Sequence, residues 1–554
     1  MSLSPSAPAP AHDGRLSVVV IAYNDEELVG EAIRSALDQG AVVAEVVAVN
    51  DASSDATGKV LDELAALHPR VRVVHREDNS GGCGTPRNDG IAAATAPYVM
   101  FLDSDDVLPP GAADALVAAA ERHRTPVAAG LCVRRELPAG RDVPWQPELY
   151  ADAAVLDGAA ALAPYTHDTL CVNKVYRRSF LSEHGIRFPD GRFVYEDFVF
   201  SARVLAAAPR IAVIPDTVYV WHVRRAAAQL SISLDRKGVE NWTARIEAHR
   251  QAVAAFADAG RDGLAAACRT KFLEHDVRLY ARELPQRGTA YQSDWWALTH
   301  AYLGSFEESE IAAAAVPARW LARLLLAAAE PRDLTRAARL AANPGLLLPP
   351  YARVDGSADG TPVWAEDLPG AVLDGVDTAP LDALPLVVDA TLRTSPTGSG
   401  ELRLTVRDLY GRLRAAGPRT AEVGFVPRGA AEPARTERVT LAEGPDGWTA
   451  RLPAGFTGLA RAGRRRGTRG TQVWDLRITV ECADGTSFGT VPRLAGVSRR
   501  SVLPSSRYGV VLVQQYTTAN GSLAVRIAPG ARDGLKVAWA KLGRLAGSTL
   551  QGKG

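Results

Sequence analysis

Tyr98-Val-Met-Phe-Leu-Asp-Ser-Asp-Asp106 is an apolar run typical of a β-strand that ends abruptly in three carboxylates. Successive side chains of a strand point to opposite faces, so Asp103 and Asp105 can lie on the same side and converge on one divalent cation. Carboxylate oxygens suit Mg²⁺ or Mn²⁺, which usually keep coordination positions open for phosphate oxygens. Any two acidic residues at a strand end reproduce this pattern, so its meaning depends on the sequence around it.

Short apolar runs alternate with helical segments between residues 15 and 126. The pattern predicts strands at 16–22, 43–49, 71–75 and 98–102, and helices at 26–39, 56–67 and 86–94, with Ser53 or Ser54 capping the second helix. This alternation is typical of a mostly parallel, Rossmann-like α/β sheet. Such sheets bind ligands at the carboxyl ends of their strands, so the polar clusters at 23–25, 50–51 and 103–105 should gather at one rim.

Two changes of periodicity divide the rest of the chain. Between about residues 240 and 347 the sequence is rich in alanine and leucine with helical spacing, and from about residue 386 the period changes to two, as expected of an antiparallel sandwich. We therefore predict a disordered N-terminus over 1–14, an α/β domain over 15–235, a helical linker over 236–347, a connector over 348–385, a C-terminal antiparallel β-sandwich over 386–540 and a tail over 541–554.

The bulk composition excludes several classes of protein. The formal net charge is zero, which gives no electrostatic reason to expect nucleic acid as a partner. The five cysteines are scattered without a CxxC pair, which argues against a zinc site or a disulfide framework. No apolar run approaches the ~18–20 residues that span a bilayer, and the first residues lack the order of a signal peptide, so we expect a cytoplasmic protein.

Four motifs then follow one another in a specific order: Val18-Val-Val-Ile-Ala-Tyr-Asn24, Val49-Asn-Asp-Ala-Ser-Ser-Asp55, Asn79-Ser-Gly81 with Arg87-Asn88, and Leu102-Asp-Ser-Asp-Asp106. Together they resemble the inverting family 2 glycosyltransferases with the GT-A fold, over roughly residues 15–225. The resemblance implies a metal-dependent transferase that moves a sugar from a UDP-sugar. The Gly-rich stretch at 81–84 is interpreted as a flexible loop, because it does not open a helix directly after a strand.

The resemblance also implies roles for the residues of these motifs. Ala22 and Tyr23 would line the uracil and ribose pocket, with Asn24 and Asn79 beside the donor. Asp51 would accept a hydrogen bond from the uracil imide. Asp103 would contact the ribose or the metal's water shell, Asp105 would ligate Mn²⁺ or Mg²⁺ at the diphosphate, and Arg87 would offer a bidentate fork to donor oxygens, although a surface role is the plain alternative for a lone arginine.

An acidic pair in Phe193-Val-Tyr-Glu-Asp-Phe198 follows the segment 173–180 and begins a predicted helix. A carboxylate at that place is favoured by the helix dipole, so ordinary N-terminal capping is the alternative interpretation. The resemblance assigns the general base to Asp197, while Glu196 would orient the acceptor or approach the metal. The implied reaction is a single displacement at the anomeric carbon with inversion.

Residues around this pair complete the predicted site. His222 would be a third metal ligand, although a lone histidine beside an aromatic residue is more often structural. Arg224 would pair with phosphate or contact the acceptor. Trp221 would form a wall of the acceptor site or part of the core, and Lys174 would contact the acceptor.

The layout of the three regions resembles the poly(ribitol-phosphate) glycosyltransferases that decorate wall teichoic acid, although the linker and β regions match only in architecture. It implies a GlcNAc-like sugar, a polyanionic glycopolymer acceptor at the inner face of the cell membrane, and trimers formed through the β region. Five arginines of a predicted Gly-rich loop could bind such an acceptor or simply be solvated: Arg461, Arg464, Arg465, Arg466 and Arg469.

Other functions stay open at this point. An enzyme that extends a capsule or exopolysaccharide would carry the same motifs, and a degenerate GT-A scaffold would carry the same fold without activity. A sugar nucleotidyltransferase would need a Gly-rich signature after the first strand, and a Rossmann dehydrogenase would need G-x-G-x-x-G there; both are absent. The sequence does not determine the sugar, the acceptor polymer or the processivity.

Overall fold

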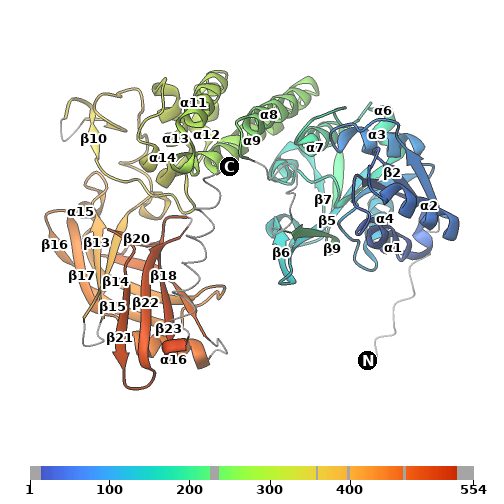
Figure 1. Cartoon of the computed structure of the whole chain (residues 1–554). Coiled ribbons are helices and arrows are strands. Elements are labelled where there is room, and N and C mark those ends of the chain that lie inside the picture. The colour runs from blue at the N-terminus through green and yellow to red at the C-terminus, as the bar shows by residue number, and fades with distance from the viewer. Residues whose placement is uncertain are drawn as a thin grey trace, which may run out of the picture. The chain divides into compact units, whose positions relative to one another are not determined.

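The computed structural model describes residues 14–224, 236–356, 360–395, 400–465, 470–518 and 520–532 (Figure 1). The chain divides into two compact units between Phe272 and Leu273. The helices after residue 236 are therefore shared between the two units. The predicted domain boundaries at 235, 347 and 385 stay predictions. The predicted N-terminal segment 1–14, apart from Gly14, and the predicted tail 541–554 lie outside the described residues.

The first unit is built on one sheet, whose order within the described residues is β3-β2-β1-β4-β8-β5-β9-β7, with β6 paired to β5. The neighbours β3, β2, β1 and β4 are parallel, as predicted, and β5 and β9 form a further parallel pair. The strands are β1 Leu16–Ala22, β2 Val43–Asn50, β3 Val71–His75, β4 Tyr98–Asp103, β5 Val127–Leu137, β6 Arg141–Trp145, β7 Ala154–Asp157, β8 Lys174–Arg177 and β9 Arg210–Arg224.

Helices surround this sheet in the α/β order that the sequence predicts. They are α1 Val29–Leu37, α2 Thr57–Leu67, α3 Gly84–Ala93, α4 Ala112–His123, α5 Gly158–Leu162, α6 Arg178–Glu183, α7 Glu196–Ala207, α8 Glu240–Asp258 and α9 Asp262–Lys271. Every residue of β1 is buried, which is the pattern of a strand covered on both faces. The α/β interpretation of the first unit is therefore confirmed.

Three details at the amino ends of these helices differ from the prediction. The first helix begins at Val29 rather than at residue 26, because the backbone N–H groups of Asp25 and Glu26 donate to side chains beyond the second strand. Neither Ser53 nor Ser54 caps α2, whose amino end has no side-chain cap. Gly84, predicted to lie in a flexible loop, is the first residue of α3 and fits there because a Cβ would collide with the carbonyl oxygen of Pro189.

An aromatic cluster packs beneath the carboxyl end of β4. Phe101 lies with its ring centroid 5.2 Å from that of Phe188 in an edge-on arrangement, and the Phe188 and Phe200 rings are stacked at 3.9 Å. Phe101 and Phe200 are fully buried. The cluster joins β4 to α7, so the ends of these two elements are held by a common apolar core.

A π-helical turn over Phe272–Val277 spans the division between the two units. The second unit then contains helices of the linker and two short helices among its strands. They are α10 Arg278–Ala281, α11 Thr289–Leu303, α12 Glu308–Ala313, α13 Ala318–Ala327, α14 Leu334–Ala341, α15 Arg412–Ala416 and α16 Phe456–Arg465. Four tryptophans of this unit are fully buried within the linker helices and the segment after them: Trp295, Trp296, Trp320 and Trp364. Large apolar side chains of the linker helices therefore pack inside this unit.

Two larger sheets follow the helices of the second unit. Within the described residues their orders are β16-β17-β13-β12-β20 and β15-β14-β18-β23-β22-β21, with β19 paired to β18, beside a two-stranded sheet of β10 and β11. The strands are β10 Ala352–Arg353, β11 Pro362–Val363, β12 Val388–Thr394, β13 Gly400–Arg407, β14 Pro418–Pro427, β15 Arg435–Thr440, β16 Ala442–Gly444, β17 Gly447–Pro453, β18 Gln472–Cys482, β19 Ser487–Thr490, β20 Arg493–Leu494, β21 Arg500–Ser505, β22 Gly509–Thr517 and β23 Leu523–Pro529.

The alternation of apolar and polar residues correctly predicts which face of these strands is buried. Residues 402, 404 and 406 of β13 are buried between partly exposed neighbours, and β18 alternates in the same way. β22 and β23 form an antiparallel pair. The predicted arginine loop is partly wrong, because Arg461 lies on α16, where helical spacing replaces the expected loop; the side chains at 464–469 lie outside the described residues.

Among the described residues, no helix is both long enough and apolar enough to cross a membrane. None of the five cysteines, all of which lie in the described ranges, forms a disulfide.

Candidate active site

The segments after β1, β2 and β4 meet at one rim of the parallel sheet, as predicted. The backbone N–H of Asn24 donates to Ser53 Oγ at 3.0 Å, and Ser104 Oγ donates to the Asp25 carboxylate. The backbone N–H of Asp51 donates to the Ala22 carbonyl at 3.0 Å. Three loops that are far apart in the sequence therefore form one continuous polar edge.

Two residues of this rim adopt the left-handed backbone conformation that non-glycine residues seldom take. Asn24 has φ 55° and Ala52 has φ 55°. The side chain of Asn24 accepts a hydrogen bond from the Ser54 N–H at 2.8 Å, which ties the two strained loops together. Ala22 is buried beneath them, whereas Tyr23 is 48% exposed and available to a ligand. Strain of this kind is concentrated at functional sites.

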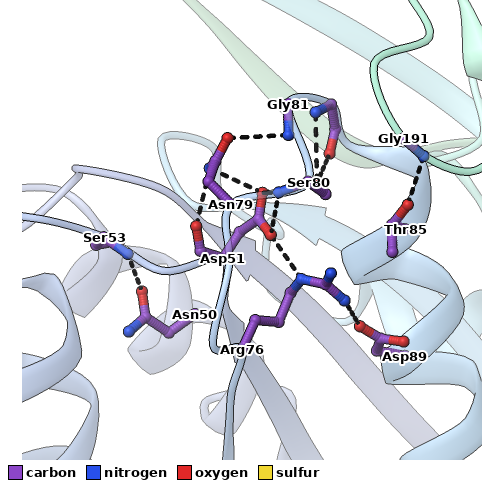
Figure 2. A network of polar contacts seen from close by, with 11 residues as sticks. Asn50, Asp51, Ser53, Arg76, Asn79, Ser80, Gly81, Thr85, Asp89 and Gly191 are labelled. Atoms are coloured by element: carbon purple, nitrogen blue, oxygen red, sulfur yellow. Dashed lines mark hydrogen bonds and ion pairs between the residues drawn. The ribbon is translucent and has the colours of Figure 1, made fainter.

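Asp51 is 4% exposed, and its carboxylate is surrounded by donors of its own chain (Figure 2). Ser80 donates its hydroxyl at 2.7 Å, Asn79 donates its amide at 3.1 Å, and Arg76 Nε forms an ion pair at 2.8 Å. Asn79 also donates to the Asp51 carbonyl at 2.9 Å. The structure thus places Asp51 and Asn79 together at the rim, with the carboxylate anchoring the loop that leads into α3.

Arg87 joins carboxylates from two distant parts of the chain. One terminal nitrogen, Nη2, donates to Asp103 Oδ1 at 2.8 Å, while Nη1 donates to Glu196 Oε1 and Asp197 Oδ1, each at 2.7 Å. Arg87 is only 2% exposed. Both terminal nitrogens of Arg87 contact carboxylates of this chain, and the fork to donor oxygens stays a prediction.

The packing of α3 explains how a buried arginine reaches this position. Gly90 lets the helix approach Val19 of β1 so closely that a Cβ would collide with the valine side chain. One turn earlier, the guanidinium of Arg87 lies 5.4 Å above the ring of Phe188. An aromatic face attracts a cation, so the apolar cluster beneath the rim also orients the arginine.

The acidic pair Glu196 and Asp197 forms the first turn of α7, as predicted. Burial, and then the neighbouring carboxylate of Asp197, raise the pKa of Glu196 to about 7, while Arg87 opposes the shift. The buried thiol of Cys171 donates to Asp197 Oδ1 at 3.3 Å. A carboxylate whose pKa lies near neutral pH is suited to proton transfer, so Glu196 can exchange a proton with a bound hydroxyl.

The three carboxylates at the end of β4 have different surroundings. The Asp103 and Asp105 side chains are 34% and 43% exposed. Partial burial, and then the charge of Asp103, raise the pKa of Asp105 to about 6, against its ion pair with Arg224 at 3.0 Å. Asp106 is buried and accepts hydrogen bonds from the Tyr219 hydroxyl and the His222 backbone N–H, both at 2.7 Å. Asp106 therefore supports the rim from inside.

Burial also raises the pKa of Asp106, and the nearby charges of Asp105 and Asp103 raise it further. Carboxylates gathered this closely disfavour one another's ionised forms. A cation bound at this rim would offset the repulsion between these carboxylates and favour their ionised forms.

The predicted metal ligands fit a hard divalent cation only in part. Within the described ranges, no three side chains of histidine, cysteine, aspartate or glutamate converge as a ready metal cluster. Asp103 and Asp105 remain as two partly exposed carboxylates, and Mg²⁺ or Mn²⁺ accepts such a pair when phosphate and water fill the other positions. His222 Nδ1 lies 2.9 Å from the Asp105 carbonyl oxygen and donates to it, so only Nε2 is left with a lone pair.

Two residues predicted to contact the acceptor substrate, Lys174 and Trp221, make contacts within this chain. The ammonium group of Lys174 is buried and donates to Asp168 Oδ2 and the Leu170 carbonyl at 2.6 Å, and to Asn173 Oδ1 at 2.9 Å. These three acceptors use its three hydrogens, so the expectation that Lys174 binds the acceptor is not supported. Trp221 is partly exposed and packs edge-on against Trp145, with ring centroids 6.0 Å apart.

Sequence reasoning missed four side chains that support the site. Asp106 is the third acidic residue of the motif Leu102-Asp-Ser-Asp-Asp106, and that motif was a signal that could have identified it. Cys171, Tyr219 and Tyr195 carry no local signal, because each acts through a contact with a residue far away in the sequence.

The comparisons with known proteins agree with this geometry. Residues 17–185 match the family model described as glycosyl transferase family 2, which covers β1 to α6 and ends before the acidic pair. One relative is a poly(ribitol-phosphate) beta-glucosyltransferase of Bacillus spizizenii, 29% identical over 223 residues, 40% of this chain and 34% of the relative. Another is the succinoglycan biosynthesis protein ExoO of Rhizobium meliloti, 31% identical over 229 residues, 40% of this chain and 64% of the relative.

A third relative is the poly(ribitol-phosphate) beta-N-acetylglucosaminyltransferase TarS of Staphylococcus aureus, 29% identical over 221 residues, 39% of this chain and 37% of the relative. The crystal structure of S. aureus TarS aligns with 93% of this chain and 85% of that chain at 18% identity and a TM-score of 0.49. The aligned sequence thus spans 34% to 64% of the length of these three relatives.

Proposed function

Because residues 17–185 match the family model described as glycosyl transferase family 2, we propose that the chain transfers a sugar from a UDP-sugar to a polymer hydroxyl with inversion at the anomeric carbon. The observation that carries the proposal is the set of contacts made by Arg87. This one side chain connects Asp103, on the rim that would hold the donor, with Asp197, the proposed general base. Arg87 therefore connects the proposed donor site with the proposed general base.

The proposed step is a direct displacement. The acceptor hydroxyl gives its proton to the Asp197 carboxylate as its oxygen forms a bond to the anomeric carbon. The bond from that carbon to the diphosphate oxygen breaks, and the electron pair leaves with UDP. Arg87 holds the carboxylate of Asp197 in place at 2.7 Å, and Glu196, tied to the same nitrogen, orients the acceptor.

On the donor side, Tyr23 and the strained loops at Asn24 and Asp51 would form the uridine pocket. Asp103 and Asp105 would hold Mg²⁺ or Mn²⁺, with His222 Nε2 as a further ligand. When bound, the cation would offset charge on the diphosphate. Arg224, which now pairs with Asp105, would be free to contact phosphate once that carboxylate binds the metal.

The names of two relatives support a polyol-phosphate acceptor and a GlcNAc-like sugar. Both are poly(ribitol-phosphate) glycosyltransferases, one for glucose and one for N-acetylglucosamine. We propose the same acceptor class here, at the inner face of the cell membrane, with trimers formed through the sheets of the second unit. A mass measurement at micromolar protein that finds monomer alone would remove the trimer from this proposal.

A second candidate function is extension of an exopolysaccharide. It is favoured by the similarity to ExoO, a succinoglycan biosynthesis protein, which has the highest identity of the three relatives. This acceptor would be a membrane-linked oligosaccharide in place of a polyol phosphate. The third candidate, an inactive scaffold, gains no support, because the carboxylates and Arg87 are all present and connected.

The test is transfer itself. The full chain would be incubated with UDP-GlcNAc, UDP-glucose or UDP-galactose and Mn²⁺, together with poly(ribitol phosphate), poly(glycerol phosphate) or a neutral oligosaccharide. We expect UDP release and a mass increase that depend on a polyol phosphate, and a β-linkage by NMR from the α-linked donor. Transfer to the neutral oligosaccharide alone would select the second candidate, and no transfer with any pair would favour the scaffold.

A further inference from the structure

The residue before the acidic pair has an unusual backbone conformation. Tyr195 has φ 73° and ψ 31°, the left-handed region, and is the residue that precedes the first turn of α7. A bulky side chain in this region is strained by roughly 1–3 kcal/mol unless its surroundings hold it there. Tyr195 is also buried, at 7% exposure, so neighbouring side chains must impose this conformation.

Helix α8 supplies the groups that hold Tyr195. The tyrosine hydroxyl donates to Oδ1 of Asn241 at 2.8 Å, and Asn241 is itself buried in the first turn of α8. One turn along, the guanidinium of Arg245 lies 4.7 Å above the Tyr195 ring and 4.9 Å above the Phe198 ring. A hydrogen bond thus holds the hydroxyl of Tyr195, and a cation–π contact holds the face of its ring.

The same helix packs on the body of α7. Val199 of α7 and Ala248 of α8 are fully buried in one small apolar cluster with Tyr195. Lys271, at the end of α9, places its ammonium nitrogen 4.5 Å above the Phe198 ring. All these residues belong to the first compact unit and lie beyond residue 185, where the family match ends.

We infer that α8 fixes the acidic pair through Tyr195, and that Asn241 and Arg245 are positioning residues for the transfer reaction. The inference rests on the proposed function of Asp197. At the start of α7, a turn hydrogen bond runs from the Phe198 N–H to the Tyr195 carbonyl at 3.1 Å. If Tyr195 relaxes to an ordinary conformation, the backbone of Glu196 and Asp197 must turn, and their 2.7 Å contacts with Arg87 are lost.

Two variants remove the hydroxyl contact from either side, and a third serves as a matched control. Tyr195→Phe removes the donor and Asn241→Leu removes the acceptor. Tyr410 of the second unit also has a positive φ of 51°, donates its hydroxyl to the Val363 carbonyl at 2.9 Å and lies 5.4 Å from the Arg353 guanidinium. Tyr410→Phe therefore loses a similar contact away from the acidic pair.

We expect Tyr195→Phe and Asn241→Leu each to lower kcat about tenfold with KM for the UDP-sugar nearly unchanged, because a small displacement of a catalytic group slows the chemical step. The double variant should lose no more than either single variant, since both break one contact. Tyr410→Phe should leave kcat unchanged at a similar loss in Tm. Equal kcat values for Tyr195→Phe and Tyr410→Phe would overturn the inference.

Hydrogen–deuterium exchange tests the same inference without any turnover. The amide of Phe198 reports directly on the first turn of α7, and it should exchange about tenfold faster in Asn241→Leu than in the wild type. Unchanged exchange at Phe198 would contradict the role of α8. Faster exchange at Phe198 in Asn241→Leu, together with a wild-type chain that transfers no sugar, would support the role of α8 and refute the proposed function.

Discussion

The parallel sheet of the first unit and the antiparallel sheets of the second use arginine in opposite ways. Arg87 is buried and contacts carboxylates that lie 16, 109 and 110 residues away in the sequence. Arg438 of β15 pairs with Glu481 of β18 on an open sheet face, where the two side chains are 57% and 45% exposed. Arg87, on α3, is therefore held by buried contacts with distant elements, whereas Arg438, on an alternating strand, makes an exposed contact that is replaceable.

The largest effect is expected at the acidic pair. Asp197→Asn keeps the size of the side chain but removes the base, so kcat should fall by roughly 100- to 10,000-fold. The affinity for UDP, measured by calorimetry, should change little because the donor rim is untouched. Asp475→Asn on β18, where the carboxylate pairs with Arg428 on a solvent face, is the control and should retain full activity. A tenfold loss or less in Asp197→Asn would remove Asp197 as the base.

The next effect tests the two arginines directly. Arg87→Met leaves three carboxylates without their cation and should lower the free energy of unfolding by about 3–5 kcal/mol, as expected when a buried ion pair loses one partner. Arg438→Met should cost no more than about 1 kcal/mol, because exposed pairs contribute little. Urea unfolding of both variants gives the comparison. Equal losses would show that the burial of Arg87 has no energetic consequence.

The smallest effect concerns pH. Because the pKa of Glu196 is raised to about 7 in the folded state, that state holds its proton more tightly than the unfolded chain does. This contribution to stability is complete below the unfolded pKa of about 4.5 and is lost as pH rises through about 7. Glu196→Gln should abolish that loss, which we expect to be about 1–3 kcal/mol between pH 5 and pH 8.

Urea unfolding at the two pH values measures this slope. Glu422→Gln, on the exposed face of β14, should leave the slope of the wild type unchanged and serves as the control. A Glu196→Gln variant with the wild-type slope would mean that Glu196 does not titrate in this range.

The sequence predicts the first unit well because its signals are local. Two of its strands, 16–22 and 71–75, have the predicted bounds, since a short apolar run between polar turns has few other interpretations. The rim was predictable too, because the carboxyl ends of parallel strands always share an edge. The alternation in β13 and β18 likewise reveals the buried face of each sheet.

The contacts of single side chains could not be predicted in this way. Arg87 was expected to contact donor oxygens, and its contacts with the acidic pair of α7 were not expected. Lys174 was expected at the acceptor, but it is enclosed by acceptors that its own loop brings together. Both outcomes depend on how closely elements approach, and the residue pattern carries no measure of that distance.

The most direct test of the central claim is a titration of UDP, GDP and CDP, with and without Mn²⁺, into the wild-type chain, Asp105→Asn and the control Asp446→Asn, whose side chain is 71% exposed. Of the three nucleotides, we expect only UDP to bind tightly, and only when Mn²⁺ is present. We expect Asp105→Asn to lose this binding and Asp446→Asn to keep it. Binding of UDP that is equal in all three proteins, or no binding of any nucleotide, would contradict the assignment of this rim as the donor site.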